Sequence, residues 1–86
     1  MKLKEGFVLR EVAGDIVVIP SGDTLDLNMM ITLNETGRFL WAKLEAGAEM
    51  PELVQALTQE YEVSAQDAER HIEKFVAKLN ENGLLA

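Results

Sequence analysis

The sequence has no cysteine, a single histidine and no long apolar run. Without cysteine the chain cannot form disulfides, thiolate nucleophiles or cysteine-ligated zinc and iron–sulfur sites. His71 alone cannot build a histidine-rich metal site within one chain. A membrane helix needs about 20 consecutive apolar residues, and no such run occurs. We therefore expect a protein with no cofactor and no membrane span.

Positive charge is also scarce. The chain has 8 Lys and Arg against 15 Asp and Glu, a net charge of −7. Nucleic-acid binders usually carry a basic excess that displaces phosphate counterions, so the balance argues against a nucleic-acid partner. The N-terminal stretch "MKLKEGF" has two lysines but no apolar segment behind them, unlike a secretory signal. A cytoplasmic location is expected.

The features of an enzyme are missing as well. No glycine-rich loop has phosphate-binding spacing. Ser21 and Ser64 suit a turn and a helix cap, and His71 has no evident partner to orient it as a catalytic base. With 86 residues and 48% hydrophobic content, residues 1–86 fit one small domain with one core. We expect a single non-catalytic domain.

Three segments in the first half read as strands. "FVLREV" (7–12) and "DIVVIP" (15–20) are rich in branched and aromatic residues, and Gly14 between them favours a tight hairpin. Residues 20–26 form a turn-like cluster, and "LNMMIT" (27–32) reads as a third strand. A meander would put the second strand in the middle of the sheet and leave the other two as edges.

After Leu33 the apolar period changes from two to about 3.6, which is typical of a helix. Thr32 and Glu35 have capping-box spacing, and Asn34 is an alternative N-cap. Gly47 is a plausible stop. The apolar face of this first helix comprises Gly37, Leu40, Trp41 and Leu44.

Two more helices follow. The second is expected to start near Pro51, and Ser64, with Asp67 three residues on, caps the third, which ends before Gly83. Their apolar faces comprise Leu53, Val54, Leu57 and Tyr61 in the second, and Ala68, Ile72, Phe75, Val76 and Leu79 in the third.

The order of elements predicts an α+β fold. Three strands followed by three helices indicate a winged-helix-like architecture, with a three-stranded antiparallel sheet packed against the helices.

From the third strand onward the sequence resembles the PqqD-like family, also called the RiPP recognition element. The resemblance lies in "LNETGRFLW" (33–41), "ELVQALTQEYEV" (52–63) and "HIEKFVAKLNENGLL" (71–85), with Leu44 and Gly47 between them. It implies a peptide-binding chaperone that binds the leader segment of a ribosomally made precursor peptide. The leader would then be presented to a modifying enzyme, for PqqD itself a radical SAM protein acting on the precursor of pyrroloquinoline quinone.

The sequence departs from the family pattern at three positions. An Asp is common in the family at Ala46, a capping Ser or Thr at Met50, and an acidic residue at His71. These departures bear on the identity of the partner more than on the fold.

The third strand is the expected peptide-binding edge, because it carries no charge or proline to protect it. Its residues Asn28, Met29, Met30, Ile31 and Thr32 would accept a guest strand. Leu27, Met29 and Ile31 are placed toward the helices, with the reverse assignment left open. A plainer interpretation is that both methionines fill the core, or that Met30 packs under the N-terminal segment.

The third helix is the expected second wall. On a helical wheel Asp67, His71, Lys74 and Lys78 share a flank, and Phe75 and Leu79 would form an apolar floor. The like charges of Arg70, Lys74 and Lys78 repel slightly at i, i+4 spacing, which favours a role in attracting acidic leader residues. The alternative is that these side chains are simply solvated.

Two other functions compete with the peptide adaptor. Arg70, Lys74 and Lys78 could instead belong to a nucleic-acid-binding winged helix. The open strand could also pair with a second copy to form a homodimer.

Overall fold

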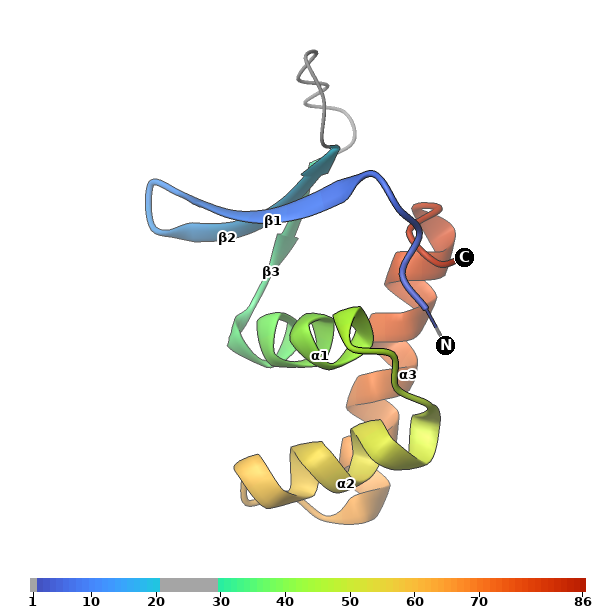
Figure 1. Cartoon of the computed structure of the whole chain (residues 1–86). Coiled ribbons are helices and arrows are strands. Elements are labelled where there is room, and N and C mark those ends of the chain that lie inside the picture. Colours follow the sequence, from blue (N-terminus) through green and yellow to red (C-terminus); the bar gives the residue numbers. More distant parts are fainter. Residues whose placement is uncertain (1, 21–29) are drawn as a thin grey trace.

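The computed structural model describes residues 2–20 and 30–86. Its architecture is the expected α+β arrangement, in which an antiparallel sheet of order β1-β2-β3 precedes three helices (Figure 1). The elements are β1 (Phe7–Val12), β2 (Asp15–Pro20), β3 (Ile31–Leu33), α1 (Glu35–Glu45), α2 (Met50–Glu60) and α3 (Ala65–Glu81).

The β1–β2 hairpin is closed by a two-residue turn. Val12 pairs with Asp15, and both turn residues have positive φ, 51° at Ala13 and 86° at Gly14. Two consecutive positive φ values characterise a type I′ turn, whose twist matches that of the flanking strands. The turn projects beyond the helices (Figure 1), and the tight hairpin expected from Gly14 is confirmed.

The third strand is shorter and lies later in the chain than expected. It covers Ile31–Leu33 rather than 27–32, and Met30 precedes it. Leu33 is included because it pairs with Ile16 of β2 and is buried in the core. Leu27, Asn28 and Met29, and the expected turn apart from Pro20, lie outside the described residues. The central position of β2 is confirmed.

Helix α1 begins at the alternative cap. The Asn34 Oδ1 atom accepts a hydrogen bond of 2.7 Å from the Gly37 N–H. The capping box of Thr32 and Glu35 is wrong, because Thr32 still pairs with Val17 in the sheet and cannot flank the helix. At the other end Gly47 follows the C-cap with a φ of 84°, as expected for a stop signal.

Helices α2 and α3 begin close to the expected positions. Helix α2 begins at Met50, one residue before Pro51. The Glu49 N–H donates to Glu52 Oε1 at 3.1 Å, which satisfies an otherwise orphan donor of the first turn. In α3 the Ser64 Oγ accepts the Asp67 N–H at 3.1 Å.

One core joins the sheet to all three helices. The predicted stripes supply it: Leu40 and Leu44 of α1, Leu57 of α2 and Ile72 of α3 are almost completely buried. From the sheet, Val18 enters the same cluster. The helices therefore fold on one face of the sheet because their apolar positions recur at helical spacing.

Phe39 lies off the main stripe of α1 and finds its partner elsewhere. Its ring contacts Tyr61, just after α2, edge to face with a centroid distance of 5.8 Å and an interplanar angle of 90°. The Lys43 Nζ lies 5.2 Å from the centre of the Phe39 ring. This arrangement fastens the end of α2 to α1 through an aromatic pair.

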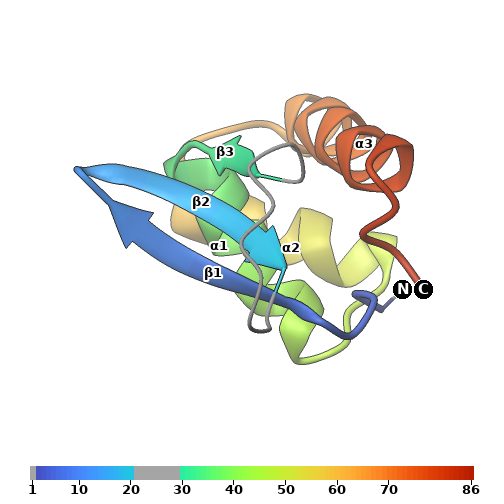
Figure 2. The same ribbon diagram turned by 90° about the horizontal axis from the view of Figure 1, so that it is seen from above.

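The two ends of the chain lie side by side (Figures 1 and 2). Leu3 and Leu85 form an antiparallel bridge, and the Lys4 N–H donates to the Leu84 carbonyl at 2.7 Å. The Leu84 side chain is buried, so the segment after α3 belongs to the core. Nothing in the sequence pattern predicted this pairing.

A close approach at Gly37 gives a test of the fold. A Cβ at this position would lie 3.2 Å from Asn34 Oδ1, 3.3 Å from Leu33 Cβ and 3.3 Å from Phe75 Cε1. We predict that Gly37→Ala lowers the free energy of unfolding by about 1 kcal/mol, because crowding outweighs the better helix propensity of alanine. Urea unfolding followed by circular dichroism measures the change.

The exposed Ala42 of the same helix provides the control. Ala42→Gly should cost only the propensity difference, about 1 kcal/mol or less. If Gly37→Ala instead stabilised the protein by a similar amount, the close approach at Gly37 would carry no energetic weight.

Candidate functional site

A cleft of about 530 Å³ separates β3 from α3, and helix α1 contributes to its floor. β3 packs on β2 and α1, whereas α3 packs chiefly on α2. Figure 2 shows α3 on the side of β3 opposite to β2. The residues lining the cleft are Thr32, Leu33, Asn34, Thr36, Gly37, Leu40, His71, Lys74, Phe75 and Lys78.

The backbone of Thr32 faces this cleft. The Lys78 Nζ donates to the Thr32 carbonyl oxygen at 2.9 Å, from the side of α3. In an antiparallel strand the N–H and C=O of one residue point to the same side, and successive residues alternate. Ile31 and Leu33 therefore direct their backbone groups to β2, while the N–H and C=O of Thr32 face the cleft.

The side chains of β3 alternate as well. Ile31 is 7% exposed and Leu33 is 5% exposed, both within the core, and Thr32 between them is exposed. The inward placement of Ile31 is confirmed, and the reversed assignment is wrong. Met30 is 42% exposed and does not line the cleft, so it is not a core residue. Asn28 and Met29 lie outside the described residues.

The wall formed by α3 brings together most of the residues expected there. His71, Lys74 and Lys78 are exposed and line the cleft, and the largely buried Phe75 contributes an aromatic surface. Leu79 is fully buried and does not line it, so this residue supports the wall from the core.

Arg70 differs from the two lysines of its row. Its Nη2 lies 3.8 Å from Asp67 Oδ1, and it is not among the cleft residues. The basic flank of the cleft is therefore made by His71, Lys74 and Lys78, one to two turns apart along α3.

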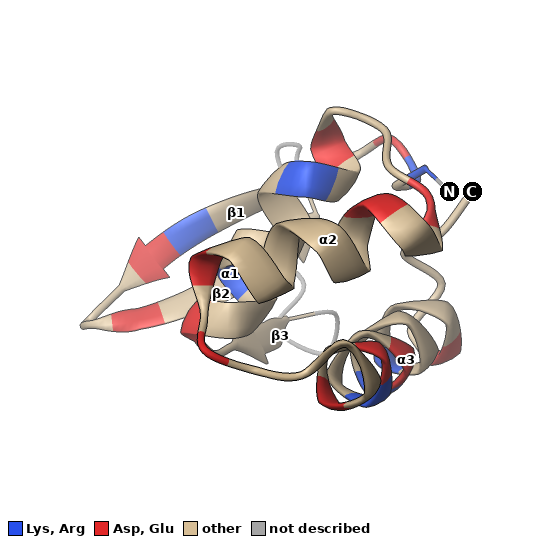
Figure 3. Cartoon of the chain, turned by 90° about the horizontal axis from the view of Figure 1, so that it is seen from below, with Lys and Arg blue, Asp and Glu red and all other residues tan. Residues whose placement is uncertain are grey.

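The electrostatics of the cleft contrast with those of the whole chain. Acidic residues occur on all three helices (Figure 3). Among the described residues that line the cleft there is no carboxylate, and its charged side chains are lysines. The cleft thus presents backbone hydrogen-bonding groups, an apolar floor and positive charge, which together suit an extended peptide with acidic residues.

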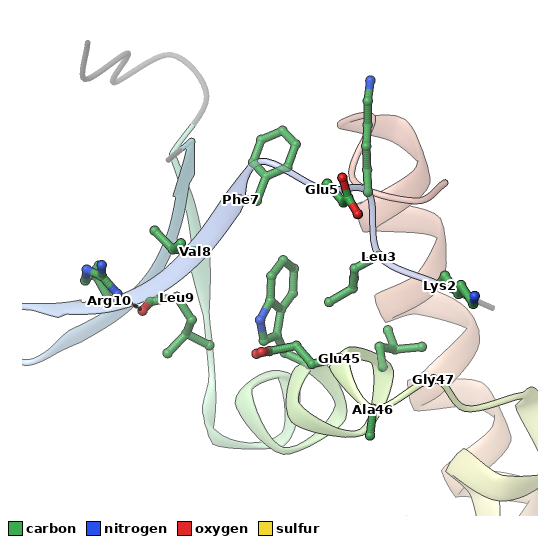
Figure 4. A pocket seen from close by; sticks show the side chains of 13 residues that line it. Lys2, Leu3, Glu5, Phe7, Val8, Leu9, Arg10, Glu45, Ala46 and Gly47 are labelled. Atoms are coloured by element: carbon green, nitrogen blue, oxygen red, sulfur yellow. Dashed lines mark hydrogen bonds between the residues drawn. The ribbon is translucent and has the colours of Figure 1, made fainter. Parts of the chain in front are cut away.

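A second, larger cleft of about 730 Å³ lies between β1, the N-terminal segment and the end of α1 (Figure 4). It was not expected, because its walls come from segments far apart in the sequence. Basic and acidic side chains mix around it: Lys2, Lys4 and Arg10 against Glu5 and Glu45.

β1 is also a guarded edge, which makes the second cleft the weaker candidate. Arg10 and Glu11 place charges on it, the usual protection of an edge strand. The Arg10 Nη1 donates to the neighbouring Leu9 carbonyl at 3.2 Å. The cleft beside β3 combines an edge with charges of one sign and is therefore the candidate site.

Neither a cluster of metal ligands nor a membrane-spanning helix occurs in the part of the chain that the structure describes. No group of three or more potential acidic or histidine ligands lies together among residues 2–20 and 30–86. Within the same residues no helix has the length and apolar character needed to cross a bilayer.

Two solved structures are similar to this chain over almost its whole length. One, described as "TbiB1 in Complex with the TbiA(beta) Leader Peptide", is 27% identical with a TM-score of 0.80 and covers 99% of this chain and 94% of that one. The other, "Lasso peptide synthetase B1 complexed with the leader peptide", is 30% identical with a TM-score of 0.74 and covers 96% and 93%. No curated protein matches significantly.

The family resemblance read from the sequence is tested by a comparison with family models. The model of "Coenzyme PQQ synthesis protein D (PqqD)" matches residues 5–85, nearly the whole chain and all six of its elements. With this match and the geometry above, the chain belongs to the PqqD family.

Proposed function

We propose that this protein is a non-catalytic adaptor that binds the leader segment of a ribosomally made precursor peptide and presents it to a modifying enzyme. The observation that carries the proposal is the open edge of β3, where the N–H and C=O of Thr32 face a cleft with a basic wall. The two similar structures, both determined with leader peptides, support the same function.

The leader would join the sheet as a fourth strand between β3 and α3. Its backbone would pair with Thr32, and its side chains would alternate between the cleft floor and solvent. An apolar leader side chain would contact Phe75, and acidic ones would approach the basic flank. The proposed binding residues are Thr32 on β3 and His71, Lys74, Phe75 and Lys78 on α3, with Ile31 and Leu79 supporting them from the core. Asn28, Met29 and Met30 belong to the proposal on the basis of the sequence alone.

Strand addition suits a partner that is disordered when free. Backbone hydrogen bonds recognise almost any extended chain, and the side-chain contacts then select among sequences. Ordering the leader costs conformational entropy, which keeps the affinity moderate and the binding reversible. Reversibility suits a protein that hands its peptide on to an enzyme.

The enzyme that receives the peptide is part of the proposal. The family resemblance points to a radical SAM protein, as for PqqD itself, and the sequence to a cytoplasmic location. One similar structure belongs to a lasso peptide synthetase, so such a synthetase is the second partner to test. Co-purification of the chain and its leader with each candidate enzyme distinguishes them.

The two competing functions use the same surface. The cleft has only a few cationic groups on a chain of net charge −7, so a nucleic-acid-binding role is not favoured. A homodimer through β3 would occupy the edge that the leader needs. Light scattering with and without leader separates a dimer that dissociates on binding from a monomeric adaptor.

The first test is binding of candidate leader peptides, drawn from any precursor genes found beside the gene for this chain. We predict that the cognate leader shifts the backbone amide NMR signals of residues 30–33 and 71–78 together, because the added strand touches both walls. A scrambled leader of the same composition and a DNA duplex serve as controls. Shifts confined to the cleft beside β1, or a response to DNA alone, would contradict the proposal.

A second test uses the direction of the Thr32 N–H. Because this group faces the cleft and not β2, Thr32→Pro removes a donor for the leader without breaking the β2–β3 ladder. We predict about tenfold weaker leader binding, equivalent to about 1.4 kcal/mol, measured by calorimetry.

Thr32→Val is the matched control for the proline variant. It removes the hydroxyl but keeps the backbone N–H, so it should bind the leader nearly as well as the wild type. Thermal unfolding of both variants verifies that the sheet is intact. Equal binding by the wild type, Thr32→Pro and Thr32→Val would show that the leader does not pair with this strand.

A further inference from the structure

The Lys78–Thr32 contact closes the edge that the proposed function needs open. The Lys78 ammonium extends from α3 and donates a hydrogen bond to the Thr32 carbonyl oxygen, with an Nζ–O distance of 2.9 Å. A leader strand pairing with β3 would direct one of its own N–H groups to this carbonyl. The lysine and the leader therefore compete for the same acceptor.

The contact is tertiary and easily reversed. Thr32 and Lys78 are 46 residues apart in the chain, and both are exposed. The lysine side chain is a flexible four-carbon stem, so its ammonium group can move away from the carbonyl without any movement of the backbone. On β1, by contrast, Arg10 contacts the carbonyl of its own neighbour, Leu9, which lies away from the cleft beside β3.

We propose that Lys78 is a displaceable guard of the β3 edge. When the leader enters, the Lys78 ammonium dissociates from the Thr32 carbonyl and pairs with a carboxylate of the leader. In the free protein the guard satisfies the exposed acceptor and disfavours pairing of β3 with any other strand. A neutral strand would displace the ammonium into water and offer it no new partner. An acidic strand would offer it a stronger, charge-assisted partner, so selection for acidic leaders follows.

Lys74 allows the guard to be separated from general charge attraction. It lies one turn before Lys78 on α3, is also exposed and also lines the cleft. Among the described side chains, however, only that of Lys78 donates a hydrogen bond to the backbone of β3. Lys74→Met and Lys78→Met each remove one positive charge from the same wall, and only the second removes the guard.

The first experiment uses the free protein and is independent of the proposed function. The carbonyl carbon NMR signal of Thr32 should move upfield in Lys78→Met and stay in place in Lys74→Met, because only the former loses the hydrogen bond. Lys78→Met should also self-associate at a protein concentration at least about threefold lower than the wild type. An unchanged Thr32 carbonyl signal in Lys78→Met overturns the guard.

The second experiment rests on the proposed function and measures binding of two peptides. One is an acidic leader peptide that the binding test above identifies, and the other is the same leader with every Asp and Glu replaced by Asn and Gln. Lys78→Met should bind the acidic leader about tenfold more weakly than the wild type and the neutral leader at least as tightly. Lys74→Met should weaken binding to the acidic leader and give no gain with the neutral one.

The outcomes separate the two ideas. If the wild type binds no leader while the carbonyl signal responds to Lys78→Met, the adaptor function fails and the guarded edge stands. If the leader binds but Lys78→Met and Lys74→Met behave alike toward both peptides, the guard fails and the adaptor function stands. Lys78→Arg keeps a charged donor of similar reach and should restore wild-type selectivity; failure to do so would count against the guard.

Discussion

The structure depends on β3, a strand that pairs on one side only among the residues that the structure describes. β3 has three residues. The side chains of its outer residues, Ile31 and Leu33, pack in the core, and their backbone groups pair with β2. Thr32 is left with its backbone facing outward, where a peptide group must find water or a partner. The function proposed for the protein is a consequence of this single unfinished row of hydrogen bonds.

The helices determine what meets that row. Helix α3 packs on α2 and touches α1 where Phe75 lies close to Gly37. Because glycine lacks a Cβ, the Phe75 ring can lie close to α1, where it lines the bottom of the cleft and does not fill it. The cleft exists because α3 is held by the other helices and not by the strand beside it.

Charge adds sequence selectivity to strand addition, because the backbone hydrogen bonds of an added strand do not by themselves distinguish one sequence from another. The chain repels acidic partners overall, with a net charge of −7, yet its cleft presents lysines and a histidine. Short-range contacts in the cleft can overcome the unfavourable overall field, because salt screens distant charges more than near ones. An edge that is attractive only locally is protected from pairing with unsuitable strands.

The sequence alone determined the type and order of the elements. The period of the apolar residues separates strands from helices, Ser64 and Gly47 mark helix ends, and Gly14 marks the hairpin, because each signal acts within a few residues. The basic flank of α3 was also readable, since helical geometry fixes which positions share a face.

Only the tertiary structure decided the rest. The sequence was compatible with Thr32 as a helix N-cap, but its pairing with Val17 holds it in the sheet. Asn34 is therefore the residue that caps the helix. Leu79 shared the expected floor with Phe75, yet the packing of α3 buries it completely. The bond from Lys78 to Thr32 and the pairing of the chain ends join residues far apart in sequence. Local patterns contain no information on such distances, which are set by how the whole chain packs.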